Sequence, residues 1–205
     1  MTPLLDSRPI IVAVAGPNGA GKSTFFQAYL RPAGLRFVNA DDLARELGVG
    51  PYESAALADQ LRREMIRQRE SFIFETVLSD PVGEKVSVLG EAVRSGYAVV
   101  LCFIGLDSVE TSEQRVAMRV SQGGHDVPTE KLAARFDRTL ANLHRAIREL
   151  PRVLVYDNSD LRNPFRSVAE FERGKAVRIS TPVPGWLKLG ADLLGGGRTR
   201  RILNR

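Results

Sequence analysis

The sequence predicts an α/β fold in three layers, with a mainly parallel five-stranded sheet between helices and a β-hairpin near the C-terminus. Apolar runs of strand length alternate with longer segments of helical period, which is the pattern of a sheet built from β–α–β units. The length of 205 residues provides the core of one domain and is short for two. Hydrophobic residues at 43% and charged residues at 26% are near globular averages, which excludes a disordered or fibrous chain.

Five segments have the composition of buried strands, because they are rich in Val, Ile or Phe and several are apolar on both faces. They span residues 10–15, 35–39, 71–75, 97–105 and 152–156. Segments with apolar residues at helical spacing lie between them, at residues 23–30, 52–69, 80–95, 107–120 and 129–150. Gly96 and Pro151 directly follow the third and the last of these helices, where such residues end helices.

The chain changes character after the fifth strand. Residues 167–173 and 175–180 alternate polar and apolar side chains around Gly174, which predicts a β-hairpin that covers one edge of the sheet. We therefore predict a single domain over residues 1–185, with the hairpin at about 165–180. Residues 186–205 are predicted to form a C-terminal segment with a basic, flexible tail.

The net charge of +5 comes almost wholly from that tail. Arg198, Arg200, Arg201 and Arg205 provide four of the five charges and follow three consecutive glycines. Because the rest of the chain is nearly neutral, we expect a solvated end rather than an arm that binds nucleic acid. A nucleic-acid partner is therefore not expected.

The single cysteine and the short apolar runs predict the compartment. Cys102 cannot form an internal disulfide and lies within an apolar run, which predicts a buried, inert thiol in a reducing environment. That run is far shorter than the roughly 20 residues that a membrane-spanning helix needs, and the N-terminus lacks a signal-peptide pattern. We therefore predict a cytoplasmic protein without a membrane partner.

The first strand leads into Gly16-Pro17-Asn18-Gly19-Ala20-Gly21-Lys22-Ser23, which matches the P-loop pattern G-x-x-x-x-G-K-[ST] in full. A strand before this loop and a helix after it direct backbone N–H groups and a helix N-terminus at an anion. Its glycines allow the backbone to approach phosphate oxygens closely. The context disfavours the alternative, a glycine-rich turn with an exposed lysine. The loop therefore predicts a nucleoside triphosphate site, without specifying the base.

Three side chains of the loop have expected roles in holding the nucleotide. Lys22 is expected to reach the β- and γ-phosphates, and the Ser23 hydroxyl to ligate Mg²⁺. Thr24, the next residue, is placed to hold the α-phosphate. ATP and Mg²⁺ are thus the expected cofactors.

Acidic residues follow the second and third strands. Asp41 and Glu75 are expected to face the same crevice as the P-loop, because ligands bind beyond the carboxyl ends of the strands in such sheets. One carboxylate can accept the proton of an attacking hydroxyl, and another can orient the acceptor or hold the water shell of the metal. The alternative is that Asp41 or Asp42 caps the helix that begins near Leu43. We assign the cap to Asp42, the functional role to Asp41, and substrate binding to Glu75 with its neighbour Thr76.

A segment rich in arginine and glycine follows the fourth strand and predicts a mobile lid at about residues 111–135. Arg115 and Arg119 share one helix face, and Arg135 and Arg138 follow the loop at residues 121–128. Phosphoryl transfer needs positive charge on the phosphoryl oxygens, so we assign catalytic roles to Arg119 and Arg135. The alternative for each arginine is a solvated helix residue.

Two further polar residues have open roles. His125, in the loop of the lid, is expected either to meet the phosphate or the acceptor, or to order the loop by a hydrogen bond. Asn158 follows the fifth strand and is expected either to border the base of the nucleotide or to form a turn.

Several separate blocks, in order along the chain, resemble the zeta toxin family of P-loop kinases. They are AGPNGAGKST at 15–24, VNAD at 38–41, FET at 74–76, RVxxRVxxGGHxVP at 115–128, Arg135, and YDNS at 156–159. The resemblance implies a kinase fold and, as in the best-understood members, phosphorylation of the 3′-hydroxyl of the sugar in UDP-N-acetylglucosamine. It implies that Lys22 and Ser23 hold ATP and magnesium, that Asp41 is the general base and that Glu75 binds the acceptor. It also implies that Arg119 and Arg135 stabilise the transferring phosphoryl group.

The sequence thus predicts an ATP- and Mg²⁺-dependent kinase of a small hydroxyl acceptor, with UDP-N-acetylglucosamine as the leading candidate. The resemblance extends to an antitoxin or other inhibitory partner, although the compact C-terminus is similar to that of stand-alone bacterial members. Two alternatives stay open. One is a P-loop kinase of another acceptor, such as a nucleoside, a sugar or an antibiotic, and the other is a nucleotide-dependent switch or a nucleic-acid-binding ATPase.

Overall fold

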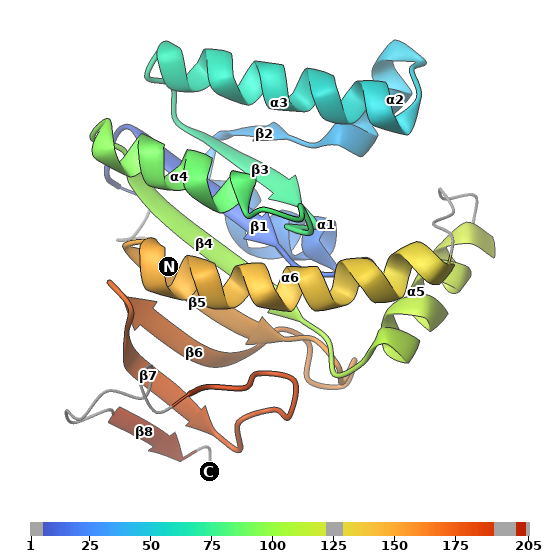
Figure 1. Ribbon diagram of the computed structural model, residues 1–205, viewed down its shortest axis with the longest axis vertical. Helices are drawn as coiled ribbons and strands as arrows, with labels where there is room; N and C mark the ends of the chain where they lie inside the picture. Colours follow the sequence, from blue (N-terminus) through green and yellow to red (C-terminus); the bar gives the residue numbers. More distant parts are fainter. Residues whose placement is uncertain (1–5, 122–128, 191–199, 204–205) are drawn as a thin grey trace.

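One sheet runs through the protein in the computed structural model, which describes residues 6–121, 129–190 and 200–203 (Figure 1). Its strands follow the order β2-β3-β1-β4-β5-β6-β7-β8. Their bounds are β1 Ile10–Ala15, β2 Arg36–Val38, β3 Phe72–Thr76, β4 Ala98–Gly105, β5 Arg152–Asp157, β6 Arg166–Glu172, β7 Lys175–Thr181 and β8 Arg200–Leu203. Strands β1 to β5 are parallel to one another, which confirms the predicted five-stranded parallel sheet.

The predicted hairpin is confirmed and extends the sheet. Strand β6 pairs antiparallel with β5, and β7 pairs antiparallel with β6. Strand β8 adds a further, parallel strand to β7 that the sequence pattern did not indicate.

The helices lie where their apolar spacing predicts them, with ends that differ by a few residues. Their bounds are α1 Lys22–Phe25, α2 Ala40–Leu47, α3 Pro51–Arg67, α4 Glu84–Arg94, α5 Val109–Ser121 and α6 Thr129–Glu149. The predicted helix at 23–30 is α-helical only in its first turn. It continues as a π-helix over Phe26–Leu30 and a short 3-10 helix over Arg31–Ala33.

Strand β1 separates two hydrophobic layers because its side chains alternate between the two faces of the sheet. Ile11, Ala13 and Ala15 join the layer under α3, α4 and α6, and the alternate residues Ile10, Val12 and Val14 join the layer under α1. All six are fully buried, which explains why the strand is apolar throughout. Figure 1 shows α3, α4 and α6 in front of the sheet and α1 behind it, as expected for three layers.

The C-terminal segment returns to the carboxyl end of β5. Trp186 and Leu187 are buried in the main core, so the domain extends past the predicted boundary at residue 185. The indole N–H of Trp186 donates to Asp157 Oδ1 at 3.2 Å, and Arg166 forms an ion pair with Asp157 Oδ2 at 3.1 Å. Residues 191–199 and 204–205 lie outside the described residues, so the flexible tail stays a prediction.

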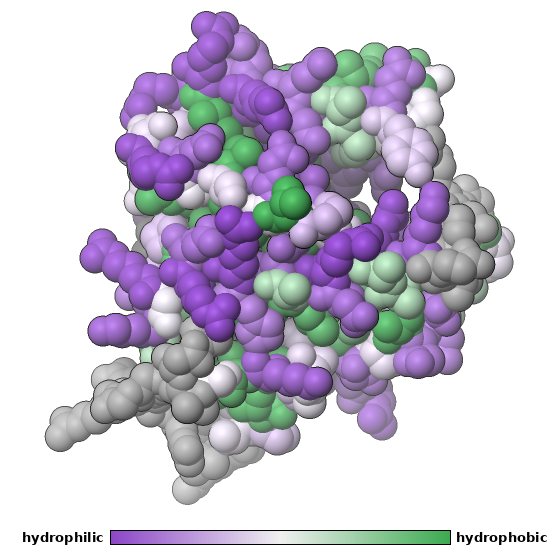
Figure 2. Space-filling model, in the orientation of Figure 1, coloured by the Kyte–Doolittle hydropathy of each residue, from purple (hydrophilic) through white to green (hydrophobic). Residues whose placement is uncertain are grey.

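Two predictions from composition can be compared with the structure. Cys102 is buried as predicted, and burial raises the pKa of its thiol to about 12. Within the described ranges, none of the helices combines the length and the apolar character needed to cross a bilayer. The face that carries α3, α4 and α6 is predominantly hydrophilic, with apolar residues in scattered patches (Figure 2).

Candidate active site

The P-loop joins β1 to α1 at the carboxyl edge of the sheet and is packed tightly on its neighbours. Gly16 has a φ of 147°, and a Cβ there would lie 2.1 Å from the Ile104 carbonyl oxygen of β4. Gly19 has a φ of 72°, and a Cβ there would lie 2.9 Å from Cβ of Arg115 on α5. Only glycine fits both the conformations and the spaces at these two positions. The loop therefore sits between the end of β4 and the first turns of α5.

Side chains from segments distant in the sequence hold the P-loop by hydrogen bonds to its backbone carbonyls. The Ser112 hydroxyl of α5 donates to the Asn18 carbonyl at 2.7 Å, and Asn158 Nδ2 donates to the Ala20 carbonyl at 2.9 Å. Asn158 Oδ1 accepts from the Phe165 N–H at 3.3 Å. These bonds tie the P-loop to α5 and to the segment after β5.

Asn158 thus has a structural role in addition to the predicted one. Its side chain is 3% exposed, and its amide donates to the phosphate loop and accepts from the segment after β5. The predicted contact with the base stays a prediction. The bracing role could have been anticipated only from the fold, since 138 residues separate Asn158 from Ala20.

Replacing Asn158 with alanine is expected to weaken ATP binding about tenfold, because the buried Ala20 carbonyl and the partly buried Phe165 N–H lose their partner and the loop loosens. Calorimetric titration with Mg-ATP measures this. Asn163→Ala, in the same segment but with an exposed side chain, is the matched control and should retain wild-type affinity. Unchanged affinity in Asn158→Ala would contradict the bracing role.

Lys22, Ser23, Asn39 and Glu75 form one cluster at the mouth of the loop. Lys22 Nζ donates to the Pro17 carbonyl at 3.1 Å and lies 3.7 Å from Glu75 Oε1. Glu75 Oε2 accepts from the Ser23 hydroxyl at 2.7 Å and from Asn39 Nδ2 at 3.1 Å. The Glu75 carboxylate therefore lies between Lys22 and Ser23, the predicted phosphate-binding and metal-binding residues.

Burial and the neighbouring carboxylates shift the pKa of Lys22 in opposite directions. Its side chain is 7% exposed, and burial lowers the pKa of its ammonium group, while Glu75 and Asp41 oppose this shift. The charge of Arg119 lowers the same pKa, so the structure brings this lid arginine into electrostatic range of the P-loop.

The donor set beside the loop fits magnesium. The Ser23 hydroxyl and the Glu75 carboxylate are hard oxygen ligands that already lie within hydrogen-bond distance of each other. Hard cations prefer such oxygens. Glu75 also lines the cavity described below, so both roles weighed for a carboxylate here, acceptor binding and support of the metal, stay predictions.

Helix α2 begins earlier than expected and places Asp41 differently from Asp42. Asn39 is the N-cap, with an extended backbone and a side-chain oxygen that accepts from the Asp41 N–H at 2.8 Å. The prediction that Asp42 caps this helix is therefore wrong. Asp42 instead forms an exposed ion pair with Arg45 at 2.7 Å. Asp41 lies in the first helical turn and faces the cavity next to Lys22.

A cavity of about 420 Å³ opens beside Lys22, between α3 and α6. Figure 2 shows the surface hollowed between these helices. Thr76 lines the cavity, and its hydroxyl accepts from the Leu78 N–H at 3.2 Å. The charged residues of the wall are Lys22, Asp41, Asp59, Arg62, Glu75, Asp80, Lys85, Arg135 and Arg138.

Only some of the predicted lid residues lie near the P-loop and the cavity. Arg135 lines the cavity, and Arg119 is near Lys22 in electrostatic terms. Arg115 does not line the cavity and donates to the Ser159 carbonyl at 3.1 Å, which ties α5 to the loop after β5. His125 lies outside the described residues, so its role stays a prediction.

The wall from α3 was missed by sequence reasoning. Ala55, Ala58, Asp59 and Arg62 share one helix face and line the cavity. Arg62 lies over the Phe74 ring at 4.9 Å and pairs with Asp59, while burial lowers the pKa of its guanidinium. The sequence did carry a signal for this wall. One face of the helix combines small alanines with charged residues, where a helix packed on a core normally has large apolar side chains.

Comparison with known proteins supports the family that the motifs suggest. The family model described as Zeta toxin matches residues 39–167, a span that begins after the P-loop. An uncharacterized protein of Haemophilus influenzae is 26% identical over 126 residues, which is 59% of this chain and 88% of the relative.

Solved structures share the fold at low sequence identity. The AvrRxo1-ORF1:-ORF2 structure with ATP has a TM-score of 0.63 at 18% identity, over 80% of this chain and 59% of that chain. The structure of the PezAT chromosomal toxin–antitoxin system of Streptococcus pneumoniae has a TM-score of 0.52 at 18% identity, over 80% of this chain and 72% of that chain. This chain thus spans about three fifths of the AvrRxo1 protein.

The family match and the P-loop lie on different parts of the chain and agree with each other. The match covers well over half of the 205 residues, and the fold around it is that of the similar structures. The chain therefore belongs to the zeta toxin family of P-loop kinases.

Proposed function

We propose that this protein transfers the γ-phosphoryl group of ATP to a hydroxyl of a small molecule, with UDP-N-acetylglucosamine as the leading acceptor. The observation that carries the proposal is the cavity that opens directly beside Lys22 and Asp41. A phosphate loop with an adjoining cavity of this size can hold two substrates with their reacting groups in contact.

The proposed roles follow from the positions of the side chains. Lys22 binds the β- and γ-phosphates, and Asp41, which faces the cavity next to Lys22, accepts the proton of the attacking hydroxyl. Bound Mg²⁺, held by Ser23 with Glu75 beside it, would supply positive charge to the phosphate oxygens. ATP as donor is supported by the AvrRxo1 structure, which has a similar fold and was determined with ATP.

The arginines supply the remaining positive charge. Arg135, on α6, lines the cavity. Arg119, on α5, is close enough to Lys22 for its charge to affect the pKa of the lysine. The predicted lid at about residues 111–135 includes most of α5 and the first turns of α6, so its closure would bring both guanidinium groups to the transferring phosphoryl group. Lys22 alone leaves the developing charge on the equatorial oxygens only partly neutralised, which is the reason for two further cations.

The wall of the cavity supports a charged acceptor such as a sugar nucleotide. Arg62, Lys85 and Arg138 line the cavity together with the catalytic candidates and provide cations that could meet a diphosphate. A volume of about 420 Å³ falls in the range of ligand pockets.

An inhibitory partner is also part of the proposal. Two structures with this fold carry partners in their names, the AvrRxo1-ORF1:-ORF2 structure and the PezAT toxin–antitoxin system. We infer that this chain has an inhibitory protein partner in the cytoplasm.

The test is mass spectrometry of reactions that contain the purified protein, Mg-ATP and a panel of sugar nucleotides, nucleosides, free sugars and aminoglycosides. We expect UDP-N-acetylglucosamine to gain one phosphoryl group. Modification of another acceptor would support the proposed kinase activity and would show that the substrate is a different molecule. ATP consumption without any modified acceptor would favour a nucleotide-dependent switch.

Filling the cavity is expected to impair acceptor binding selectively. Ala55 lies on the cavity side of α3 and is exposed, so Ala55→Trp should raise the KM for the acceptor about tenfold and leave ATP affinity unchanged. Ala56→Trp is the matched control, because Ala56 is equally exposed but is not part of the wall. Steady-state kinetics with each substrate varied separately measure the effect, and an equal result for the two variants would contradict the assignment of the cavity.

A further inference from the structure

The inner face of α6 carries polar residues where a core helix normally carries apolar ones. Thr139 is fully buried and Asn142 is 7% exposed. Arg138 lies one turn before Asn142 on the same stripe of the helix, and Arg145 lies one turn after it. Buried polar groups are costly unless they are paired, so their partners indicate their purpose.

Their partners are the backbone carbonyls of one loop, which follows β3. The Thr139 hydroxyl donates to the Val77 carbonyl at 2.9 Å, and Arg138 Nε donates to the Ser79 carbonyl at 2.8 Å. Asn142 Nδ2 donates to the Leu78 carbonyl at 2.8 Å and to the Asp80 carbonyl at 2.9 Å. Four successive carbonyls are therefore bound by a single helix.

The loop departs from ordinary backbone geometry at its centre. Leu78 has a φ of 60°, a left-handed conformation that is unusual for leucine, and it is 1% exposed. Such a conformation persists only when its surroundings determine it. Asn142 provides this support, because it binds the carbonyls of both Leu78 and Asp80, the two ends of this segment.

The same loop forms one wall of the cavity. Val77, Leu78, Ser79 and Asp80 all line it, directly after Glu75 and Thr76. Arg135 lines the same cavity and lies one helical turn before Thr139 on α6. Helix α6 thus carries both Arg135, which lines the cavity, and the side chains whose bonds hold the wall.

We infer that Thr139 and Asn142 are positioning residues that hold the acceptor wall of the cavity at a fixed distance from Arg135. This inference rests on the proposed kinase function. Because the hydroxyl acceptor must meet the phosphoryl group in line, a wall that shifts relative to Arg135 would weaken both acceptor binding and turnover. ATP would be held as before, since the bonds of Thr139 and Asn142 do not reach the P-loop.

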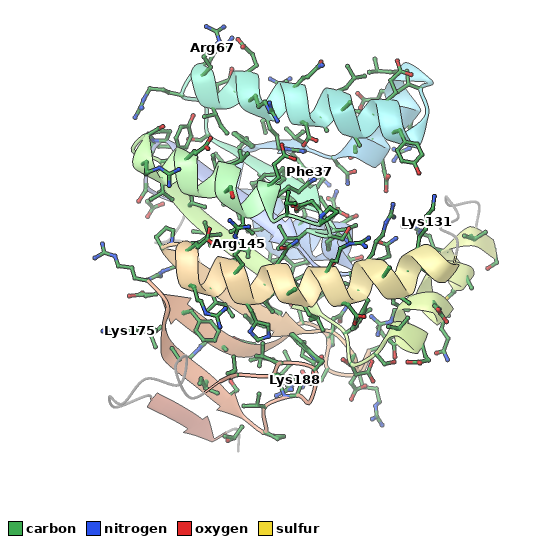
Figure 3. All side chains as sticks on the ribbon, in the orientation of Figure 1. Phe37, Arg67, Lys131, Arg145, Lys175 and Lys188 are labelled. Carbon is green, nitrogen blue, oxygen red and sulfur yellow. The ribbon has the colours of Figure 1, made fainter. Side chains whose placement is uncertain are left out.

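The experiment compares variants that keep shape but remove the bonds. Thr139→Val and Asn142→Leu remove the donors, and Thr139→Ser keeps the hydroxyl. Arg145→Met is the matched control on the same stripe of α6 (Figure 3), because Arg145 donates to the Val82 carbonyl and to Ser87, both outside the cavity wall. Hydrogen exchange of residues 77–80, ATP affinity, and kcat and KM with UDP-N-acetylglucosamine as the acceptor are measured for each variant.

We expect Thr139→Val and Asn142→Leu to speed hydrogen exchange of residues 77–80 and to lower kcat/KM for the acceptor about tenfold, with ATP affinity within about twofold of wild type. Thr139→Ser should restore both, and Arg145→Met should change neither. Acceptor kinetics within about twofold of wild type in Thr139→Val and Asn142→Leu, or an equal loss in Arg145→Met, would overturn the inference.

A wild-type protein that does not phosphorylate UDP-N-acetylglucosamine would be a failure of the proposed substrate alone. The inference is then decided by hydrogen exchange of residues 77–80, which needs no acceptor. Faster exchange in Thr139→Val and Asn142→Leu, with wild-type exchange in Arg145→Met, supports it. Unchanged exchange in Thr139→Val and Asn142→Leu overturns it.

Discussion

Replacing Lys22 with methionine is expected to lower phosphoryl transfer by about a thousandfold, because the charge proposed to bind the β- and γ-phosphates is removed from a water-poor site. Methionine keeps the length of the buried stem, so the loop retains its packing. The rate of ADP release with ATP and acceptor measures the loss. Lys175→Met, an exposed lysine on β7, is the control and should retain wild-type activity.

The same substitution is expected to leave the protein at least as stable as wild type. Burial lowers the pKa of Lys22, so the folded state binds its proton less tightly than the unfolded state does. Stability of the wild type therefore rises with pH between the lowered folded pKa and the ordinary unfolded one, and the charged lysine costs stability below that window.

The advantage of Lys22→Met should accordingly be present at neutral pH and shrink as the pH rises through that window. Thermal unfolding at several pH values measures it. A Lys22→Met protein with near-normal turnover would remove the P-loop from the catalytic mechanism, and one that unfolds at a much lower temperature would contradict the cost assigned to the buried charge.

Asp41→Asn is expected to lower kcat by about a hundredfold or more while ATP affinity is retained, because asparagine keeps the shape of the residue but cannot accept the proton of the attacking hydroxyl. The backbone N–H of residue 41 still donates to Asn39, so the start of α2 should not change. Stopped assays for kcat, with calorimetry for ATP binding, separate the two effects.

The neighbouring aspartate provides a matched control for this prediction. Asp42 carries the same charge in the same helical turn but forms an exposed ion pair with Arg45, so Asp42→Asn should remain within about twofold of wild type. If Asp41→Asn and Asp42→Asn have equal kcat values, the general base must be a different residue.

The fold and the nucleotide loop could be predicted because both depend on short stretches of sequence. The all-buried strand β1 is apolar in every residue, and the loop after it carries its glycines at the positions where a side chain would collide with β4 and α5. Such features are determined by backbone geometry, so they can be recognised from the residue types in a short stretch of sequence.

The parts that were missed depend on contacts between distant segments. The cap of α2 is Asn39 rather than Asp42, because the strand ends one residue before it and its own side chain reaches the Asp41 N–H. The bracing role of Asn158 and the cavity wall from α3 appear only once β5 and α3 are placed beside the P-loop. The spacing of residues along one segment does not indicate which side chains of a neighbouring helix will contact it.

The central position of β1 determines when the nucleotide site can form during synthesis. β1 lies between β3 and β4, which are distant from it in the sequence, and Ile11 has Phe72 and Val99 as its partners. Contacts of such long sequence separation form slowly because a large loop must close first. The last brace of the P-loop, from Asn158 to Ala20, requires a segment 138 residues further on. A nascent chain that has emerged only through α3 carries the complete P-loop motif but lacks both strands that flank it. ATP binding should therefore arise late in translation, and the ribosome-bound chain is inactive until most of the domain has been made.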